Sequence, residues 1–123
     1  MNARGFVAFR YKGRMRGGVI YLLHFKEPLE HAQHYIGFCH SLEKLPERLG
    51  YHRRGNGSKL LRAVMLAGGD FECVRVFVGS KTDERRLKNR HYAPRLCPMC
   101  QPSPVIPKDC EQLQPERWQK LLG

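Results

Sequence analysis

The chain has 123 residues, enough for one domain with a modest core and too few for a second independent core. Its 22 lysines and arginines against 11 acidic residues give a net charge of +11, which favours a polyanionic partner, nucleic acid first and an anionic membrane surface second. The sequence contains neither a run of about 18 apolar residues nor an apolar segment typical of a signal peptide, so we expect a cytoplasmic protein without a membrane span. The five cysteines are an odd number, which argues against a disulfide framework and favours reduced thiols.

The first third of the chain predicts a basic arm followed by two strands. Residues 1–17 are basic and lack sustained periodicity, so we expect an arm. Residues 19–25 and 34–39 are apolar, β-branched and aromatic, as in strands that are buried on both faces. Because Pro28 disfavours a continuous strand, we expect an extended loop over 25–33 that joins the two strands as an antiparallel pair.

The middle of the chain predicts three helices and one further strand. The helices are expected over 46–54, 58–67 and 83–90. Pro46 suits a first helical position, and Ser58 and Thr82 suit the N-caps of the second and third helices. Alternate valines predict a strand over 71–78.

The last third differs in composition. Six of the eight prolines lie beyond residue 92, which indicates an extended tail. A final turn around 116–122 carries the only tryptophan, Trp118, and is expected to dock back on the domain.

Four stretches of the predicted elements share the motifs of one enzyme family. "VIY" at 19–21 and "YIG" at 35–37 are followed by "RLGYHRRGNGSKLLRAV" at 48–64 and by "DERRLKNR" at 83–90. In this order they resemble the GIY-YIG nucleases: the two name-giving motifs, an Arg-x3-His helix with a Gly-x-Gly-x-Lys turn, and a helix with a catalytic glutamate. The resemblance implies an α+β domain with a small three-stranded antiparallel sheet flanked by helices.

The resemblance covers about residues 18–96 and divides the chain into three parts. The basic arm of residues 1–17 precedes the nuclease-like domain, and a tail of residues 97–123, rich in proline and cysteine, packs on the domain or extends it. The family cuts phosphodiester bonds with one divalent metal, so the expected activity is a metal-dependent endonuclease that uses Mg²⁺ or Mn²⁺.

The resemblance also implies roles for five residues. Tyr21 would be the base that activates water, which requires a phenol with a lowered pKa. Tyr35 would bind the nucleophile or the phosphate, and Glu84 would hold the metal. Arg48 and His52 are four residues apart and share a helix face, so both can reach one phosphate.

Other residues are expected to contact nucleic acid. They are Gly37, Arg53, Arg54, Lys59, Arg85 and Lys88. Gly37 would let the backbone approach closely or mark a bulge. Gly55, Gly57 and Lys59 form either a phosphate-gripping turn or an ordinary helix end followed by a loop.

The sequence departs from the family in ways that leave alternatives open. Val19 stands where the family usually has glycine, and residues 96–99 stand where many members have an asparagine. The missing asparagine favours a non-catalytic nucleic-acid-binding module on the same fold as the first alternative. DNA is the favoured substrate, with single against double strand and RNA undecided, and a protein partner or a homodimer would supply specificity.

A cysteine pair in the tail gives the second alternative, a zinc-stabilised interaction protein. Cys97 and Cys100 have the spacing of half a zinc site, which Cys110 and a histidine such as His91 would complete. Because a second close pair is lacking, free thiols in a packed tail are the favoured interpretation.

Overall fold

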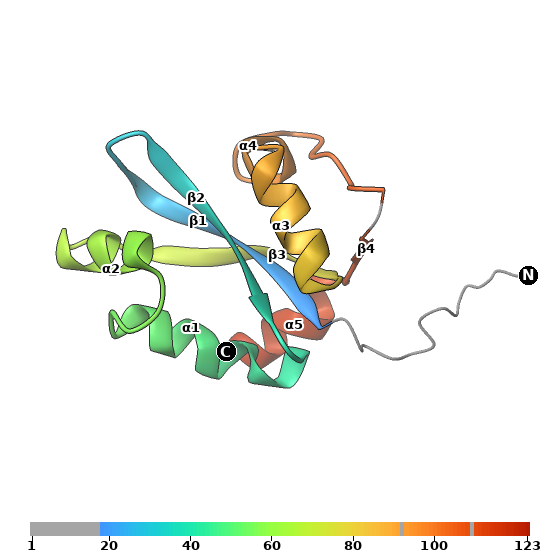
Figure 1. The fold of residues 1–123 in the computed structure, drawn as a ribbon, viewed down its shortest axis with the longest axis horizontal. Helices are drawn as coiled ribbons and strands as arrows, with labels where there is room; N and C mark the ends of the chain where they lie inside the picture. The colour runs from blue at the N-terminus through green and yellow to red at the C-terminus, as the bar shows by residue number, and fades with distance from the viewer. Residues whose placement is uncertain (1–17, 92, 109) are drawn as a thin grey trace, which may run out of the picture.

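The fold is α+β, with one antiparallel sheet between two groups of helices (Figure 1). It is seen in a computed structural model that describes residues 18–91, 93–108 and 110–123. The predicted arm of residues 1–17 lies outside the described residues. The α+β class is confirmed.

The sheet has four strands where three were predicted. They are β1 (Val19–Leu29), β2 (Ala32–Cys39), β3 (Phe71–Val78) and β4 (Glu111–Gln112), in the spatial order β2-β1-β3-β4. The added strand β4 comes from the tail and pairs with the end of β3, Phe77 opposite Gln112. It satisfies part of a strand edge that the three-stranded sheet would leave unpaired.

The loop predicted over 25–33 is wrong. β1 and β2 form one long hairpin whose turn consists of Glu30 and His31, with Glu30 in the left-handed region at φ 55°. Pro28 is accommodated because the pairing of β1 with β3 ends at Phe25, so its missing N–H breaks no bond to β3. The pairing of β1 with β2 is also irregular in the segment that holds Pro28.

The helices follow the predicted order, with shifted ends. They are η2 (Leu42–Lys44), α1 (Leu45–Arg53), α2 (Lys59–Leu66), α3 (Lys81–Asn89), α4 (Ala93–Leu96) and α5 (Pro115–Leu122). Ser58 caps α2 as predicted, since its side chain accepts from the N–H groups of Leu60 and Leu61. The predicted cap Thr82 is wrong: Ser80 caps α3 and forms a reciprocal capping box with Asp83. In the described ranges, none of the helices is long and apolar enough to cross a membrane.

Side chains of β1 alternate between two cores, one on each face of the sheet. Tyr21 and Leu23 point to the face covered by α1, α2 and α5 (Figure 1). Ile20 and Leu22 point to the opposite face, where α3 and α4 pack. β1 is therefore buried on both faces, as its continuous apolar sequence predicts.

The tail is part of this core. Trp118 on α5 is only 2% exposed and packs with the first face. On the second face, the guanidinium of buried Arg75 donates to the carbonyl oxygens of Leu96 and Val105 and to the side chain of Gln112. The predicted docking of the turn around Trp118 is thus present as the helix α5.

Candidate functional site

The register of the β1–β2 hairpin places Tyr21 opposite Gly37. A Cβ added to Gly37 would lie 2.4 Å from the Tyr21 hydroxyl oxygen, so the phenol lies directly across the glycine. Any side chain at position 37 would displace the Tyr21 ring. A glycine is therefore needed at position 37 to leave room for the Tyr21 ring, whether or not a substrate also approaches the strand there.

Two side chains from successive turns of α1 converge on the Tyr21 hydroxyl. His52 Nε2 is 2.8 Å from this oxygen, and the guanidinium of Arg48 also donates a hydrogen bond to it. The Tyr35 ring completes the group, with its centroid 5.5 Å from that of His52 and 6.3 Å from that of Tyr21. These four residues, called the tyrosine cluster below, are four of the five predicted catalytic residues.

The loop between α1 and α2 holds the His52 ring. A Cβ on Gly57 would lie 2.3 Å from His52 Nδ1, and the backbone N–H of Ser58 donates to the same nitrogen at 3.4 Å. Gly55 ends α1 at φ +80°, as expected of a helix end followed by a loop. In this structure the Gly-x-Gly turn thus serves to end the helix and to pack against His52.

These contacts define the protonation of His52. Burial, and then the charge of Arg48, lower its pKa to about 4, so the ring is neutral near neutral pH. Because Nδ1 accepts from Ser58, the single ring proton lies on Nε2 and is donated to the Tyr21 oxygen. Arg48 and His52 therefore both present N–H donors to one phenol oxygen.

Tyr21 itself differs from the expectation of a lowered pKa. Burial raises its pKa above the usual value by more than the hydrogen bond from Arg48 lowers it. Neither Tyr21 nor His52 has any exposed surface. In this environment Tyr21 is a neutral phenol near neutral pH, and losing its proton requires further positive charge nearby.

Glu84, the fifth predicted catalytic residue, is linked to the tyrosine cluster by a lysine that contacts both. It lies in the first turn of α3 and is 7% exposed. Lys88, one turn later, has its Nζ 3.0 Å from Glu84 Oε2 and 5.2 Å from the centroid of the Tyr35 ring. The side-chain contacts from Tyr35 to Lys88 and from Lys88 to Glu84 thus connect helix α3, on one face of the sheet, to the tyrosine cluster on the other.

Two pockets line the edge strand β2, one on each side of this arrangement. One, of about 460 Å³, includes Arg48 and three other cationic side chains: Lys44, Arg54 and Lys81. The other, of about 520 Å³, includes Tyr35 and Lys88. The edge of the sheet beside the tyrosine cluster is therefore concave on both sides, with cationic side chains concentrated in the pocket that holds Arg48.

The remaining residues predicted to contact nucleic acid divide into two groups. Lys59 on α2 and Arg85 on α3 are exposed, and Arg54 lines the cationic pocket. Arg53 instead donates to the Phe71 carbonyl at 2.9 Å, stacks on the Phe71 ring at 4.5 Å and pairs with Asp70. Arg53 therefore fixes α1 to the start of β3.

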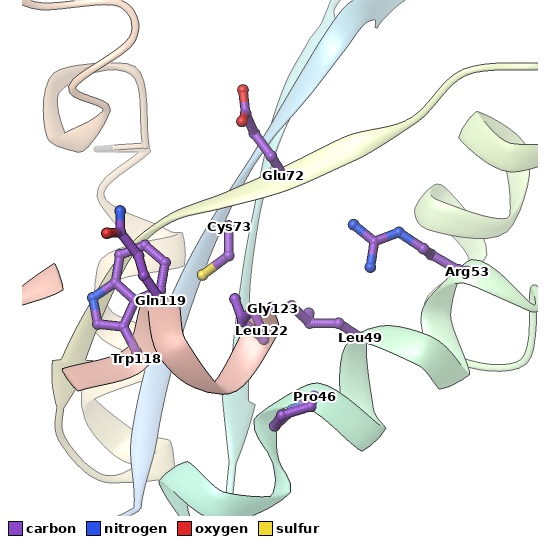
Figure 2. A pocket seen from close by; sticks show the side chains of 9 residues that line it. All are labelled: Pro46, Leu49, Arg53, Glu72, Cys73, Trp118, Gln119, Leu122 and Gly123. Atoms are coloured by element: carbon purple, nitrogen blue, oxygen red, sulfur yellow. The ribbon is translucent and has the colours of Figure 1, made fainter. Parts of the chain in front are cut away.

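A further pocket of about 370 Å³ lies between α1, β3 and α5 (Figure 2). Leu49, Cys73 and Trp118 are among its lining residues, and the tyrosine cluster contributes none. Burial raises the pKa of the Cys73 thiol to about 12, so this thiol stays protonated and is a poor nucleophile. We therefore place the candidate active site at the tyrosine cluster and not in this pocket.

A separate group of four side chains could hold a metal ion. The ligand atoms of His24, His34, Cys97 and Cys100 all lie within 4.8 Å of one another. Two imidazoles and two sulfurs suit zinc, whereas Mg²⁺ and Mn²⁺ prefer oxygen ligands. The prediction from the sequence had the cysteine pair but the wrong partners, since Cys110 and His91 are not in this group.

The sequence shows both histidines, but only the register of the hairpin shows that they lie opposite each other. His24 and His34 are direct cross-strand partners, with ring centroids 5.2 Å apart. An expected loop over 25–33 gave no reason to place them opposite each other. Only the continuous hairpin brings both to the turn that carries Cys97 and Cys100.

Comparison with family models, with curated proteins and with solved structures found no match to this chain. We therefore infer the function from the tyrosine cluster, its surroundings and the motifs that form it.

Proposed function

We propose that this protein is a metal-dependent endonuclease of the GIY-YIG type that hydrolyses phosphodiester bonds in nucleic acid, with DNA the favoured substrate. The observation that carries the proposal is the convergence of Arg48 and His52 on the Tyr21 hydroxyl beside Tyr35. A strand tyrosine that only packs needs no such pair of donors. Residues that are far apart in the sequence meet here in the combination that the motifs imply.

In the proposed reaction, the oxygen of a water molecule attacks phosphorus and the bond from phosphorus to one sugar oxygen breaks. Tyr21 orients the water and, as a phenolate, takes its proton. The donors Arg48 and His52 both stabilise the negative charge on the phenol oxygen. His52 does so as a neutral ring, because a pKa of about 4 makes it a weak base near neutral pH.

Arg48 is suited to bind the phosphate at the same time. Its guanidinium has five N–H donors, and its side chain is exposed in the cationic pocket. It can therefore keep its bond to Tyr21 and present other donors to a phosphate oxygen. Tyr35, partly buried at the edge strand, is the second group positioned to reach the phosphate.

The proposed site for the catalytic metal is Glu84. One carboxylate completed by waters and a substrate phosphate is ordinary coordination for Mg²⁺. A divalent cation there would supply the positive charge that phosphate and phenol both require. Lys88 neutralises Glu84 in this structure, and its exposed side chain can turn toward a phosphate when a cation takes its place.

The second candidate is a nucleic-acid-binding module that does not cut. The complete burial of Tyr21 and His52, together with the raised pKa of the phenol, favours it. Both candidates use the net charge of +11 and the cationic edge of the sheet, so binding alone cannot separate them.

The separating experiment is a cleavage assay on labelled single- and double-stranded DNA and RNA with Mg²⁺, with Mn²⁺ and without either ion. The ions are omitted rather than chelated, because a chelator would also act on the His/Cys group. We expect cutting that requires Mg²⁺ or Mn²⁺ and falls about a hundredfold in Glu84→Gln, while Glu116→Gln, which changes an exposed glutamate on α5, cuts like the parent. Salt-sensitive binding with no cutting under any condition would establish the binding module instead.

A further inference from the structure

We propose that His24, His34, Cys97 and Cys100 bind one zinc ion that ties the β1–β2 hairpin to the turn following α4. The site does not depend on the nuclease proposal, because none of its ligands belongs to the tyrosine cluster. Its ligands come from three segments, β1, β2 and residues 97–100. The metal would thus link the two histidines to cysteines that lie 63 (97 − 34) to 76 (100 − 24) residues further along the chain.

The distances among the ligand atoms fit a tetrahedral zinc site. His24 Nδ1 is 3.4 Å from both His34 Nε2 and Cys97 Sγ, and Cys100 Sγ is 3.4 Å from His34 Nε2. The fourth measured separation, from His24 Nδ1 to Cys100 Sγ, is 3.8 Å. Zn–N bonds of about 2.0–2.1 Å and Zn–S bonds of about 2.3 Å at tetrahedral angles require N···N separations of about 3.4 Å and N···S separations of about 3.6 Å.

The backbone around the cysteine pair is arranged to present the sulfurs. The N–H groups of Cys100 and Gln101 donate to the Cys97 carbonyl at 3.1 and 3.0 Å, which closes a tight turn. The N–H groups of Met99 and Cys100 donate to the Cys97 sulfur. Backbone donors of this kind fix the orientation of a ligand sulfur.

A packing role alone accounts for these residues less well. Cys97 is buried against the apolar face with Ile20 and Leu96, but Cys100 is exposed. An exposed thiol and two adjacent imidazoles gain little from burial, and two neighbouring histidines repel each other when charged. A shared cation gives all four polar groups one favourable partner, and the exposed Cys100 provides a path for the ion to enter.

The consequence would be structural. Residues 97–108 contain no helix or strand; Val105 ties them to the fold through its N–H, which donates to the Arg95 carbonyl, and through its own carbonyl, which accepts from Arg75. A zinc ion at their start would anchor this segment to the sheet and keep α4 docked on β2. Binding to the folded chain alone stabilises it by mass action.

The test measures metal directly. The 123-residue chain is purified, loaded with ZnCl₂, passed through gel filtration and analysed by elemental mass spectrometry, and a second sample is loaded with CoCl₂ for visible absorption. We expect about one zinc per chain and intense cobalt d–d bands typical of a tetrahedral site with thiolate ligands. Sub-stoichiometric zinc, or the weak bands of octahedral cobalt, would overturn the proposal.

Variants identify the ligands. Cys100→Ser and His34→Gln should each lower zinc content at least about tenfold. Cys73→Ala, which removes a cysteine on the other face of the sheet, and Cys110→Ala should retain it. Loss of zinc in Cys110→Ala with retention in His34→Gln would replace the proposed ligand set with another.

A stability readout covers the case in which a variant folds poorly. A zinc chelator should lower the thermal midpoint of the parent protein, and the midpoint should recover when ZnCl₂ is returned in excess. The same treatment should leave the midpoint of Cys100→Ser unchanged. Equal shifts in both proteins, or no shift in the parent, would contradict a structural zinc.

Discussion

Acidification is expected to destabilise the protein through His52. Its pKa is about 4 in the folded state and 6.5 when the chain unfolds, because the folded ring is buried beside Arg48. Below pH 6.5 the unfolded state binds more protons than the folded state, so stability falls as the pH falls from 6.5 toward 4. Between about pH 7 and pH 5, the two pKa values give a loss of roughly 2 kcal/mol from this one side chain.

The measurement is urea unfolding at both pH values for the parent and for His52→Gln. Glutamine cannot titrate but can still donate to the Tyr21 oxygen. Because every other ionisable group is common to both proteins, the contributions of those groups cancel in the difference. The parent should lose roughly 2 kcal/mol more than the variant on acidification. Parallel losses in the two proteins would refute the account of a neutral, buried His52.

Three further outcomes follow from the packing and the charge. Gly37→Ala should lower the free energy of unfolding by about 1–3 kcal/mol and reduce cleavage, because the added Cβ would clash with Tyr21. Gly50→Ala should be tolerated, because its added Cβ would come no nearer than 3.5 Å to another side chain. Equal stabilities of the two variants in urea unfolding would contradict this expectation. Ser80→Ala should lower stability by about 1 kcal/mol, because Ser80 is the N-cap of α3, and Thr82→Ala, which changes an exposed residue, should lower it much less. A larger loss for Thr82→Ala in thermal unfolding would show that Thr82 is the N-cap, as predicted from the sequence. Affinity for a DNA duplex, measured by fluorescence anisotropy, should fall steeply between about 50 and 200 mM salt, and a flat dependence would exclude phosphate neutralisation as its source.

The local signals of the sequence predicted most of the elements. The strand over 71–78 has the bounds of β3, because its apolar and β-branched residues are bounded by Gly69 and Gly79. A shift of register between Leu22 and Leu23, however, interrupts the pairing of this strand with β1. As a result Val74 packs on the face opposite Val76. Alternation along one strand cannot reveal such a shift, because it depends on the partner strand.

The structure of the tail also depends on contacts with distant parts of the chain, which its own sequence does not reveal. The tail was expected to be extended because of its prolines, yet Pro94 and Pro115 lie in first helical turns, where a missing N–H costs nothing. The fourth strand β4 has only two residues and forms because β3 offers it an edge.

The candidate site was predicted more completely than its chemistry. The resemblance of the motifs implied that Tyr21, Tyr35, Arg48 and His52 would lie together, and these four side chains are neighbours in the structure. The burial that raises the pKa of Tyr21, and the lysine between Glu84 and Tyr35, depend on packing and could not be read from motif order.

The central claim is that the Tyr21 hydroxyl takes part in phosphodiester cleavage. Its most direct test is single-turnover cleavage of a labelled DNA duplex by Tyr21→Phe, with Mg²⁺ or Mn²⁺ present and all DNA bound. Ser103→Ala is the control, since it also removes one hydroxyl group and Ser103 is exposed in the tail, outside the pockets beside the tyrosine cluster. The account predicts that Tyr21→Phe cuts at least about a hundredfold more slowly, roughly 2.7 kcal/mol of barrier, at unchanged DNA affinity, while Ser103→Ala cuts like the parent. Equal cleavage rates in all three proteins, or a parent protein that binds DNA and never cuts it, would contradict the claim.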